Sequence, residues 1–221
     1  MEMKKSYRFL RGTLKLFSRR MKVEWEVPYD GQPSVFCPNH DRAWGPIDMC
    51  VHFDLRDTCH PWYNAAVADR KTVPEYVRND FWWEPGCRME KFYSATIPYA
   101  AAAILPPVLK CVPGVPVHHD MNVLKTFRQS ASILKDGENI VIFAEKPVGY
   151  RQSATELQDG FLQIAPMIWR SSGVALNFYP VRVDHKKKII RVFKPVAFDP
   201  ERTLPEQKQE IIEYLGRHVI G

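Results

Sequence analysis

The sequence has few cysteines and none of the spacings that usually hold a metal. Its five cysteines are odd in number and widely spaced, and no Cys-x-x-Cys pair occurs among them. This pattern argues against a disulfide scaffold and against a structural zinc site, and it fits a reducing cytosol. We therefore expect a cytoplasmic protein with no metal and no bound cofactor.

The sequence also lacks a long hydrophobic run. The N-terminus is charged from Glu2 onward and has no apolar signal-peptide core, and no stretch approaches the roughly 20 apolar residues that span a bilayer. We see no internal repeats and no low-complexity tracts. Any contact with a membrane is therefore expected to be peripheral.

The overall composition indicates one domain with a basic surface. The 221 residues are 45% hydrophobic, enough for a sizeable core, and the formal net charge is +6. A basic surface suits nucleic acid, anionic lipid or phosphorylated substrates, and charge alone does not choose among them. Trp82, Trp83 and Tyr93 are stacking candidates, but no recognised nucleic-acid-binding motif accompanies them, so we expect no nucleic-acid partner.

The residue pattern of 1–24 predicts a basic amphipathic helix, which precedes a main domain at 25–221. Apolar and basic residues each recur at steps of three and four, namely Tyr7, Leu10, Leu14, Phe17 and Met21, and Lys4, Arg8, Arg11, Lys15, Arg19 and Lys22. Such a helix can lie in the headgroup region of a membrane, bound through residues such as Arg8, Arg11, Lys15 and Phe17. Alternatively it docks on the domain with its charged face in solvent, and periodicity leaves both interpretations open.

Predicted strands and helices alternate along the rest of the chain. The hydrophobic patterns predict strands at 34–37, 139–144, 175–183 and 189–198, and helices at 46–53, 123–134, 157–169 and 205–219. This order predicts an α/β fold in a single domain, with a mixed central sheet flanked by helices and one hairpin near the C-terminal end. Residues 97–117 carry too many prolines for one long helix, so they either cover the core or form an apolar wall for lipid.

Polar residues that can carry chemistry follow two of these strands. The stretch CPNHDRAWGPID, from Cys37 to Asp48, places His40 in a loop between a strand and a helix, and Glu145 follows the strand at 139–144. Strand ends are where open α/β sheets bind their ligands, and histidine titrates near neutrality. On its own, His40 flanked by Asn39 and Asp41 also fits an ordinary turn.

Taken together and in this order, these segments resemble the glycerolipid acyltransferase family, which acylates lysophosphatidic acid and related lysophospholipids. The resemblance covers roughly Phe9 to Val196. The family's first motif, Asn-His, four residues and Asp, aligns with Asn39 to Gly45, so that glycine stands at the aspartate position. Its other motifs look like 115–122, with His119 at the arginine position, 143–151, which keeps Glu145, and 178–183.

The resemblance implies a glycerol-3-phosphate acyltransferase-like fold for the main domain at 25–221 and the transfer of an acyl group from acyl-CoA or acyl-acyl carrier protein (acyl-ACP) to a lysophospholipid-like hydroxyl or amine. His40 is then the general base. Asp48, one turn beyond Gly45 on the predicted helix, is the expected orienting carboxylate, ahead of the adjacent Asp41. The residues expected at the substrate are Asn39, Asp41, His119, Glu145, Lys146, Arg151 and Arg182. The expected partners are the inner surface of the membrane and the acyl donor, including an acyl carrier protein.

Two alternatives stay open at this stage. One is a catalytically inactive relative that binds lipid, because the family's motif aspartate and arginine are both replaced. The other is a metal site built from His118, His119 and Asp120 together with His40 and Asp41. Neighbouring histidines on a strand point to opposite faces, which disfavours this site.

Overall fold

The computed structural model describes residues 5–18, 20–41, 44–80, 82–118, 122–146 and 154–220. Within these residues, eight strands form one mixed sheet in the order β1-β7-β6-β2-β5-β3-β4, with β8 paired to β6. The strands are β1 (Lys22–Trp25), β2 (Ser34–Pro38), β3 (Cys59–Asn64), β4 (Val115–Val117), β5 (Asn139–Val141), β6 (Asn177–Asp184), β7 (Ile189–Val192) and β8 (Val196–Ala197). β6 pairs antiparallel with β7 and β8, and the other pairs are parallel. The predicted α/β class with a mixed central sheet is confirmed.

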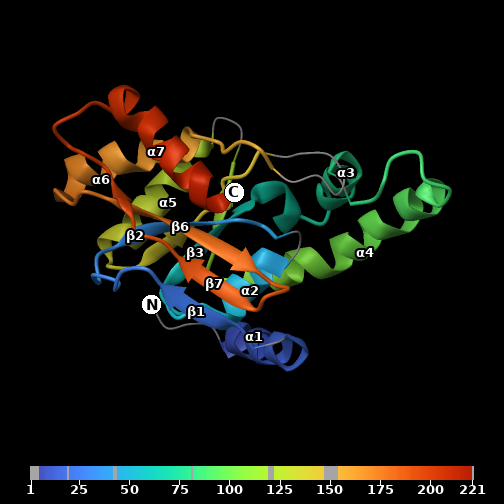
Figure 1. Ribbon diagram of the computed structural model, residues 1–221. Coiled ribbons are helices and arrows are strands. Elements are labelled where there is room, and N and C mark those ends of the chain that lie inside the picture. Colours follow the sequence, from blue (N-terminus) through green and yellow to red (C-terminus); the bar gives the residue numbers. More distant parts are fainter. Residues whose placement is uncertain are drawn as a thin grey trace.

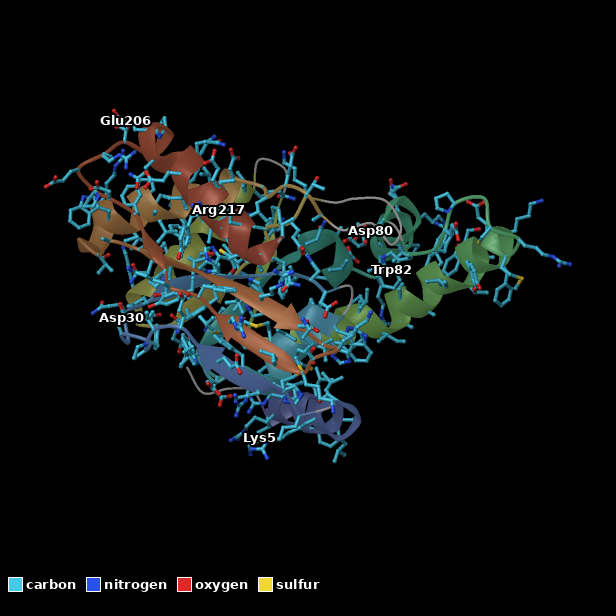
Figure 2. The ribbon with its side chains drawn as sticks, viewed as in Figure 1. Lys5, Asp30, Asp80, Trp82, Glu206 and Arg217 are labelled. Carbon is cyan, nitrogen blue, oxygen red and sulfur yellow. The ribbon has the colours of Figure 1, made fainter. Side chains whose placement is uncertain are left out.

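Helices cover both faces of this sheet. Helices α5, α6 and α7 lie on one side, and α1 and α2 lie on the other (Figure 1). In Figure 2, Lys5 of α1 and Arg217 of α7 mark these opposite sides. The helices are α1 (Lys5–Phe17), α2 (Trp44–His52), α3 (Val73–Asn79), α4 (Glu90–Cys111), α5 (Val123–Lys135), α6 (Ile164–Ser172) and α7 (Leu204–Val219), with short 3₁₀ helices at Ala65–Ala68 and Gly160–Gln163.

The central strand β2 is buried on both faces. Val35 and Cys37 pack in one core cluster with Leu215 of α7, whereas Phe36 points the other way and packs with Phe53 near the end of α2. A strand covered by helices on both sides has no polar face, so it appears in the sequence as a continuous apolar run. The residues that follow such a strand emerge from the core at its C-terminal end, where the candidate site lies.

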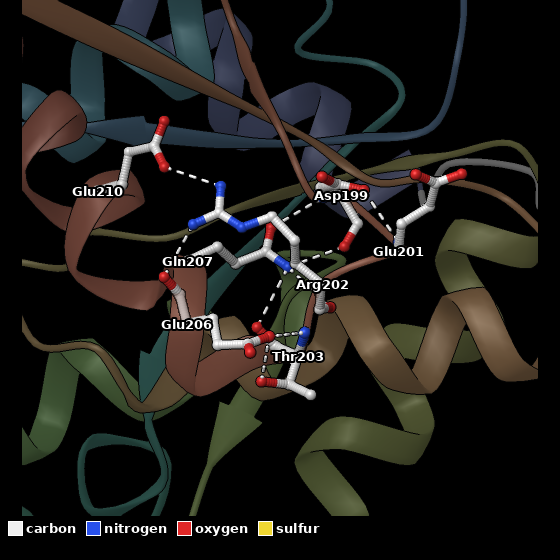
Figure 3. Close-up of polar contacts among 7 residues, drawn as sticks. All are labelled: Asp199, Glu201, Arg202, Thr203, Glu206, Gln207 and Glu210. Atoms are coloured by element: carbon white, nitrogen blue, oxygen red, sulfur yellow. Dashed lines mark hydrogen bonds and ion pairs between the residues drawn. The ribbon is translucent and has the colours of Figure 1, made fainter.

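Helix α7 begins with a network of polar side chains (Figure 3). The Thr203 backbone N–H donates to Glu206 Oε2 at 2.7 Å and the Thr203 side chain accepts from the Glu206 backbone N–H, which are the two bonds of a capping box. Thr203 Oγ1 also lies 2.8 Å from Glu206 Oε2. The buried side chain of Gln207 accepts from the Asp199 N–H and donates to the Asp199 carbonyl, both at 2.8 Å. These bonds fix the point at which the chain enters α7 and brings Leu215 onto the sheet.

The long helix α4 overturns the expectation for residues 97–117. The helix runs unbroken from Glu90 to Cys111, with Pro98, Pro106 and Pro107 inside it. An interior proline costs roughly 3 kcal/mol, and the burial of Pro98 and Pro106 against the rest of the fold offsets that cost. By length and composition α4 is apolar enough to cross a bilayer, which differs from the expectation that no stretch of the sequence is long and apolar enough to do so. Core helices of soluble proteins pass the same test but are mostly buried, whereas 22% of the apolar window of α4 is buried. In Figure 1 it extends away from the sheet, alongside α3.

Candidate active site

Two strand ends bring His40 and Glu145 together. His40 lies two residues beyond β2, and Glu145 lies four residues beyond β5, the parallel neighbour of β2. His40 Nδ1 lies 2.6 Å from Glu145 Oε2, and the His40 backbone N–H donates to the same oxygen at 2.7 Å. We call this pair the His40–Glu145 dyad.

The dyad leaves the outer nitrogen of the imidazole ring as the acceptor. A carboxylate accepts hydrogen bonds and does not donate them, so the bond to Glu145 requires the proton to be on Nδ1. In the neutral ring, Nε2 then carries the lone pair. The His40 side chain is 47% exposed and Glu145 is 14% exposed, so the carboxylate lies behind a ring that substrate can reach. The Phe143 ring, at 4.7 Å from the His40 ring, packs against its side.

The prediction that Asp48 orients His40 is wrong. Asp48 is fully buried on α2, and its Oδ2 lies 2.8 Å from Nδ1 of His185, in the turn that follows β6. The other carboxylate oxygen, Oδ1, has no hydrogen-bond partner among the described residues. The second choice, Asp41, also points elsewhere, because its Oδ2 accepts the backbone N–H of His185 at 2.7 Å.

Position 45, where the motif that this sequence resembles has an aspartate, accommodates only glycine in this structure. The first turn of α2 folds back against the His40 loop, and the Gly45 N–H donates to the His40 carbonyl at 2.6 Å. A Cβ atom at position 45 would lie 2.2 Å from that carbonyl oxygen and 2.5 Å from the Asn39 oxygen. Both distances are far inside van der Waals contact, so this backbone accommodates only glycine.

The β6–β7 turn holds the His40 loop in place. Asn39 bonds both backbone groups of Val183, accepting from its N–H at 2.7 Å and donating to its carbonyl at 3.1 Å. Trp44 stacks on His185 with ring centroids 4.2 Å apart and planes 9° from parallel. Asp41 adopts φ of 38°, a left-handed conformation that is rare for non-glycine residues and that its bond to His185 supports. Asn39 and Asp41, expected at the substrate, therefore act as supports of the loop.

Removal of the His185 ring is expected to destabilise the protein by about 3 kcal/mol, because it strands the buried carboxylate of Asp48. The substitution His185→Ala and the matched control Lys186→Ala, an exposed residue in the same turn, are compared by urea unfolding. The control should stay within about 0.5 kcal/mol of the wild type. Equal midpoints for the two variants would contradict the role given to His185.

The dyad lies on the wall of a cavity of about 1070 Å³. The lining is mostly apolar and comes from α1, α2, β3, α4 and α5, with Leu10, Met49, Leu109 and Phe127 as examples. This volume is slightly above the usual range for small-molecule sites, roughly 300–1,000 Å³. The geometry therefore combines a polar proton acceptor with room for a large apolar ligand.

The apolar stripe of α1 forms part of this wall. Tyr7 is buried, and Leu10 and Leu14 line the cavity. Arg11, expected at a membrane, also lines the cavity and forms an ion pair with Asp57. The apolar stripe of this helix is therefore docked on the domain, whereas lipid contact through Arg11 or through the exposed face of the helix stays a prediction.

The remaining residues predicted at the site or at the membrane are Lys146, Arg182, Arg8, His119, Arg151 and Phe17. Lys146 is half exposed and pairs with Glu156, whose hydrogen bond raises the lysine's pKa. Arg182 is exposed on β6 opposite Arg191 and is absent from the lining of this cavity, so its contact with substrate stays a prediction. Arg8 is exposed on α1. His119, Arg151 and the side chain of Phe17 lie outside the described residues.

The alternative metal site falls partly outside the part of the chain that the structure describes. His119 and Asp120 are not described, whereas His118 is described and lines the cavity. Within the described ranges, no three His, Cys, Asp or Glu side chains form a group with the geometry to hold a metal ion.

Comparison with protein-family models and with curated protein sequences found no match to this chain. The likeness to glycerolipid acyltransferases therefore rests on the motif order and spacing in this sequence, and it stays a prediction.

Proposed function

We propose that this protein is a peripheral membrane acyltransferase at the inner surface of the membrane. It moves a fatty acyl group from an acyl-CoA or acyl-ACP thioester to a hydroxyl or amine of a lysophospholipid-like acceptor. The observation that carries the proposal is the His40–Glu145 dyad on the wall of a large apolar cavity. A proton acceptor beside an apolar cavity suits a substrate with a reactive polar end and a long acyl chain.

The chemistry requires one proton to move twice. His40 Nε2 takes the proton from the acceptor hydroxyl as its oxygen attacks the thioester carbonyl, and Glu145 stabilises the imidazolium that forms. The tetrahedral intermediate then expels the thiolate, which receives the proton from Nε2. The products are an acyl ester and a free thiol, and no covalent acyl-enzyme forms.

The apolar cavity is the proposed site of the acyl chain. Leu105, Val108 and Leu109 of α4 line it on one side, and Leu10 and Leu14 of α1 line it on another. Burial of a chain methylene stabilises the complex by about 0.8 kcal/mol. The inactive lipid-binding alternative uses the same cavity, but a histidine paired to a carboxylate has no necessary part in lipid storage, so the dyad favours catalysis.

The test is a thiol-release assay with the purified protein. Palmitoyl-CoA and palmitoyl-ACP are offered with a panel of lysophosphatidic acid, lysophosphatidylglycerol, lysophosphatidylethanolamine and a long-chain amine. Acyl transfer predicts thiol release that depends on the acceptor, with an equal amount of acylated acceptor found by mass spectrometry. Thiol release without any acylated product indicates a thioesterase, and no release with any pair supports the inactive relative.

A membrane contact through the outer face of α1 predicts a loss of vesicle binding when its exposed apolar residues are removed. Phe9 and Leu16 are 79% and 83% exposed, beside the exposed Arg8 and Lys15. A helix with this surface can insert apolar side chains while its cations contact anionic headgroups. Flotation with phosphatidylglycerol vesicles should therefore decrease about tenfold for the Phe9→Ser, Leu16→Ser double variant.

The matched control for this measurement is Trp169→Ser on α6, which also removes an exposed apolar side chain. The control should float like the wild type. Equal flotation of the double variant and the wild type would place the membrane contact elsewhere, and α4 is then the next candidate because Phe92, Tyr99 and Ile104 are exposed on it.

A further inference from the structure

A second cavity, of about 890 Å³, lies beside the C-terminal end of α1 and is lined by basic residues. Four separate segments contribute to its wall: the end of α1 with the chain into β1, the end of α2, the loop that follows α2, and the β6–β7 turn. Its cationic residues are Lys15, Arg20, Lys22, Arg56 and Lys188. One carboxylate, Asp54, is also in the lining. We call this the basic cavity.

Most of this positive charge is not neutralised by acidic side chains of the protein. Within the described ranges, no ion pair joins Lys15, Arg20 or Lys188 to a carboxylate. Asp54 accepts a hydrogen bond from the Trp25 indole N–H at 3.1 Å. Lys22 differs from the others, because it pairs with Glu24 at 2.9 Å.

The arrangement of the cations indicates a site for an anion. Like charges that surround one concavity repel one another and focus a positive potential into the space between them. His52 lies on the cavity wall, and its pKa is lowered mainly by burial; Asp48 opposes this, and Lys15 and Arg56 contribute smaller lowering effects. Such an arrangement is stabilised when a ligand brings negative charge.

The size of the cavity indicates the class of ligand. The cavity volume falls in the range of sites for organic ligands, roughly 300–1,000 Å³, and is too large for a single inorganic ion. Lysine and arginine side chains are the usual protein partners of phosphate groups. Arg56 lines both this cavity and the apolar cavity, so the two are neighbours across one side chain.

We propose that the basic cavity binds the phosphate groups of an organic phosphate. Two substrates of the proposed reaction carry such groups, the nucleotide of acyl-CoA and the phosphate of a lysophospholipid. The identity of the ligand as a substrate rests on the proposed acyl transfer, whereas phosphate binding itself does not. Coenzyme A and dihexanoylphosphatidic acid, the latter below its micelle concentration, serve as the two probes, and adenosine and dihexanoylphosphatidylcholine are their matched controls.

The experiment measures binding to the full chain by isothermal titration calorimetry, with two double variants of equal charge change. Lys15→Glu, Lys188→Glu reverses two cations of the basic cavity. Lys5→Glu, Lys186→Glu reverses two exposed lysines on the same α1 and the same turn that are not in the lining. The cavity variant should weaken binding of the preferred probe about tenfold or more, and the control variant should change it by about twofold or less.

Each outcome decides the proposal. Preferred binding of coenzyme A assigns the cavity to the acyl donor, and preferred binding of the phosphatidic acid assigns it to the acceptor. Binding of neither phosphate probe, or equal weakening by both double variants, overturns the proposal. Phosphate binding without any thiol release would refute the proposed acyl transfer and leave the anion site standing, so the two failures are distinguishable.

Discussion

Glu145→Gln is expected to lower kcat/KM for acyl transfer by about 10³-fold. The glutamine side chain keeps the size of the carboxylate but removes its charge, and its amide N–H₂ favours the ring tautomer with the lone pair on Nδ1. His40 Nε2 then no longer accepts a proton from substrate, and the imidazolium loses its counter-charge. A carboxylate in the corresponding position of a serine protease triad contributes about 10⁴-fold, which sets the scale. Steady-state thiol release, measured at varied acyl-CoA concentration with a saturating acceptor, gives kcat/KM for the wild type and the variant.

Asp48→Asn is the matched control for this prediction. It makes the same change in a carboxylate that also bonds a histidine, but the histidine is His185. The variant should lose stability, and at a temperature where it remains folded its kcat/KM should fall less than about tenfold. A large loss in Asp48→Asn with a small loss in Glu145→Gln would show that the orienting carboxylate has been assigned to the wrong residue.

Gly45→Asp, which places an aspartate where the acyltransferase motif that this sequence resembles has one, is expected to abolish activity. Any Cβ at this position would lie 2.2 Å from the His40 carbonyl oxygen, so the backbone that carries His40 must move. Even Gly45→Ala should cost about 3 kcal/mol or more, at the upper end of the usual range for overpacking. Thermal unfolding and thiol release measured on the same samples separate a folding defect from a displaced base.

The control for this substitution is Gly12→Ala in α1. A Cβ at Gly12 meets no atom within 4 Å, so alanine should stabilise the helix by about 0.5–1 kcal/mol. A Gly45→Asp protein that is folded and faster than the wild type would contradict the account. It would show that the loop can adopt a geometry in which position 45 supplies the orienting carboxylate.

Some regular elements of the fold were predicted from local patterns, whereas β1, β3, β4 and α3 were not predicted. The buried run at 34–37 became β2, and the pattern at 123–134 with Gly137 after it became α5, with that glycine at φ of 81°. The pattern at 205–219 became α7, and the structure adds a capping box of Thr203 and Glu206 at its start. These features depend on residues close together in the sequence.

Helix α4 was not predictable by the same rules. The penalty for Pro98, Pro106 and Pro107 is local and visible in the sequence. The packing that offsets it comes from elements elsewhere in the chain, including α3, which contacts α4 extensively and shares a small core with it through Val73, Val77 and Ala101.

The partner of His40 was predictable in kind but not in identity. The motif spacing led the search to carboxylates within a few residues, Asp41 and Asp48. The carboxylate that bonds the ring is 105 residues away in the sequence and reaches it because β2 and β5 are adjacent. His185 was missed for the same reason, since it is 137 residues from Asp48 and sits in a lysine-rich turn.

The most direct test of the account is the formation of acylated acceptor by the wild type and by His40→Ala at equal protein concentration. Mass spectrometry measures the product, and circular dichroism of the two proteins shows that both are folded. The account predicts acceptor-dependent product with the wild type and a rate at least about 10³-fold lower with His40→Ala. Product formed at the same rate by both proteins would contradict the claim that the His40–Glu145 dyad is the catalytic base.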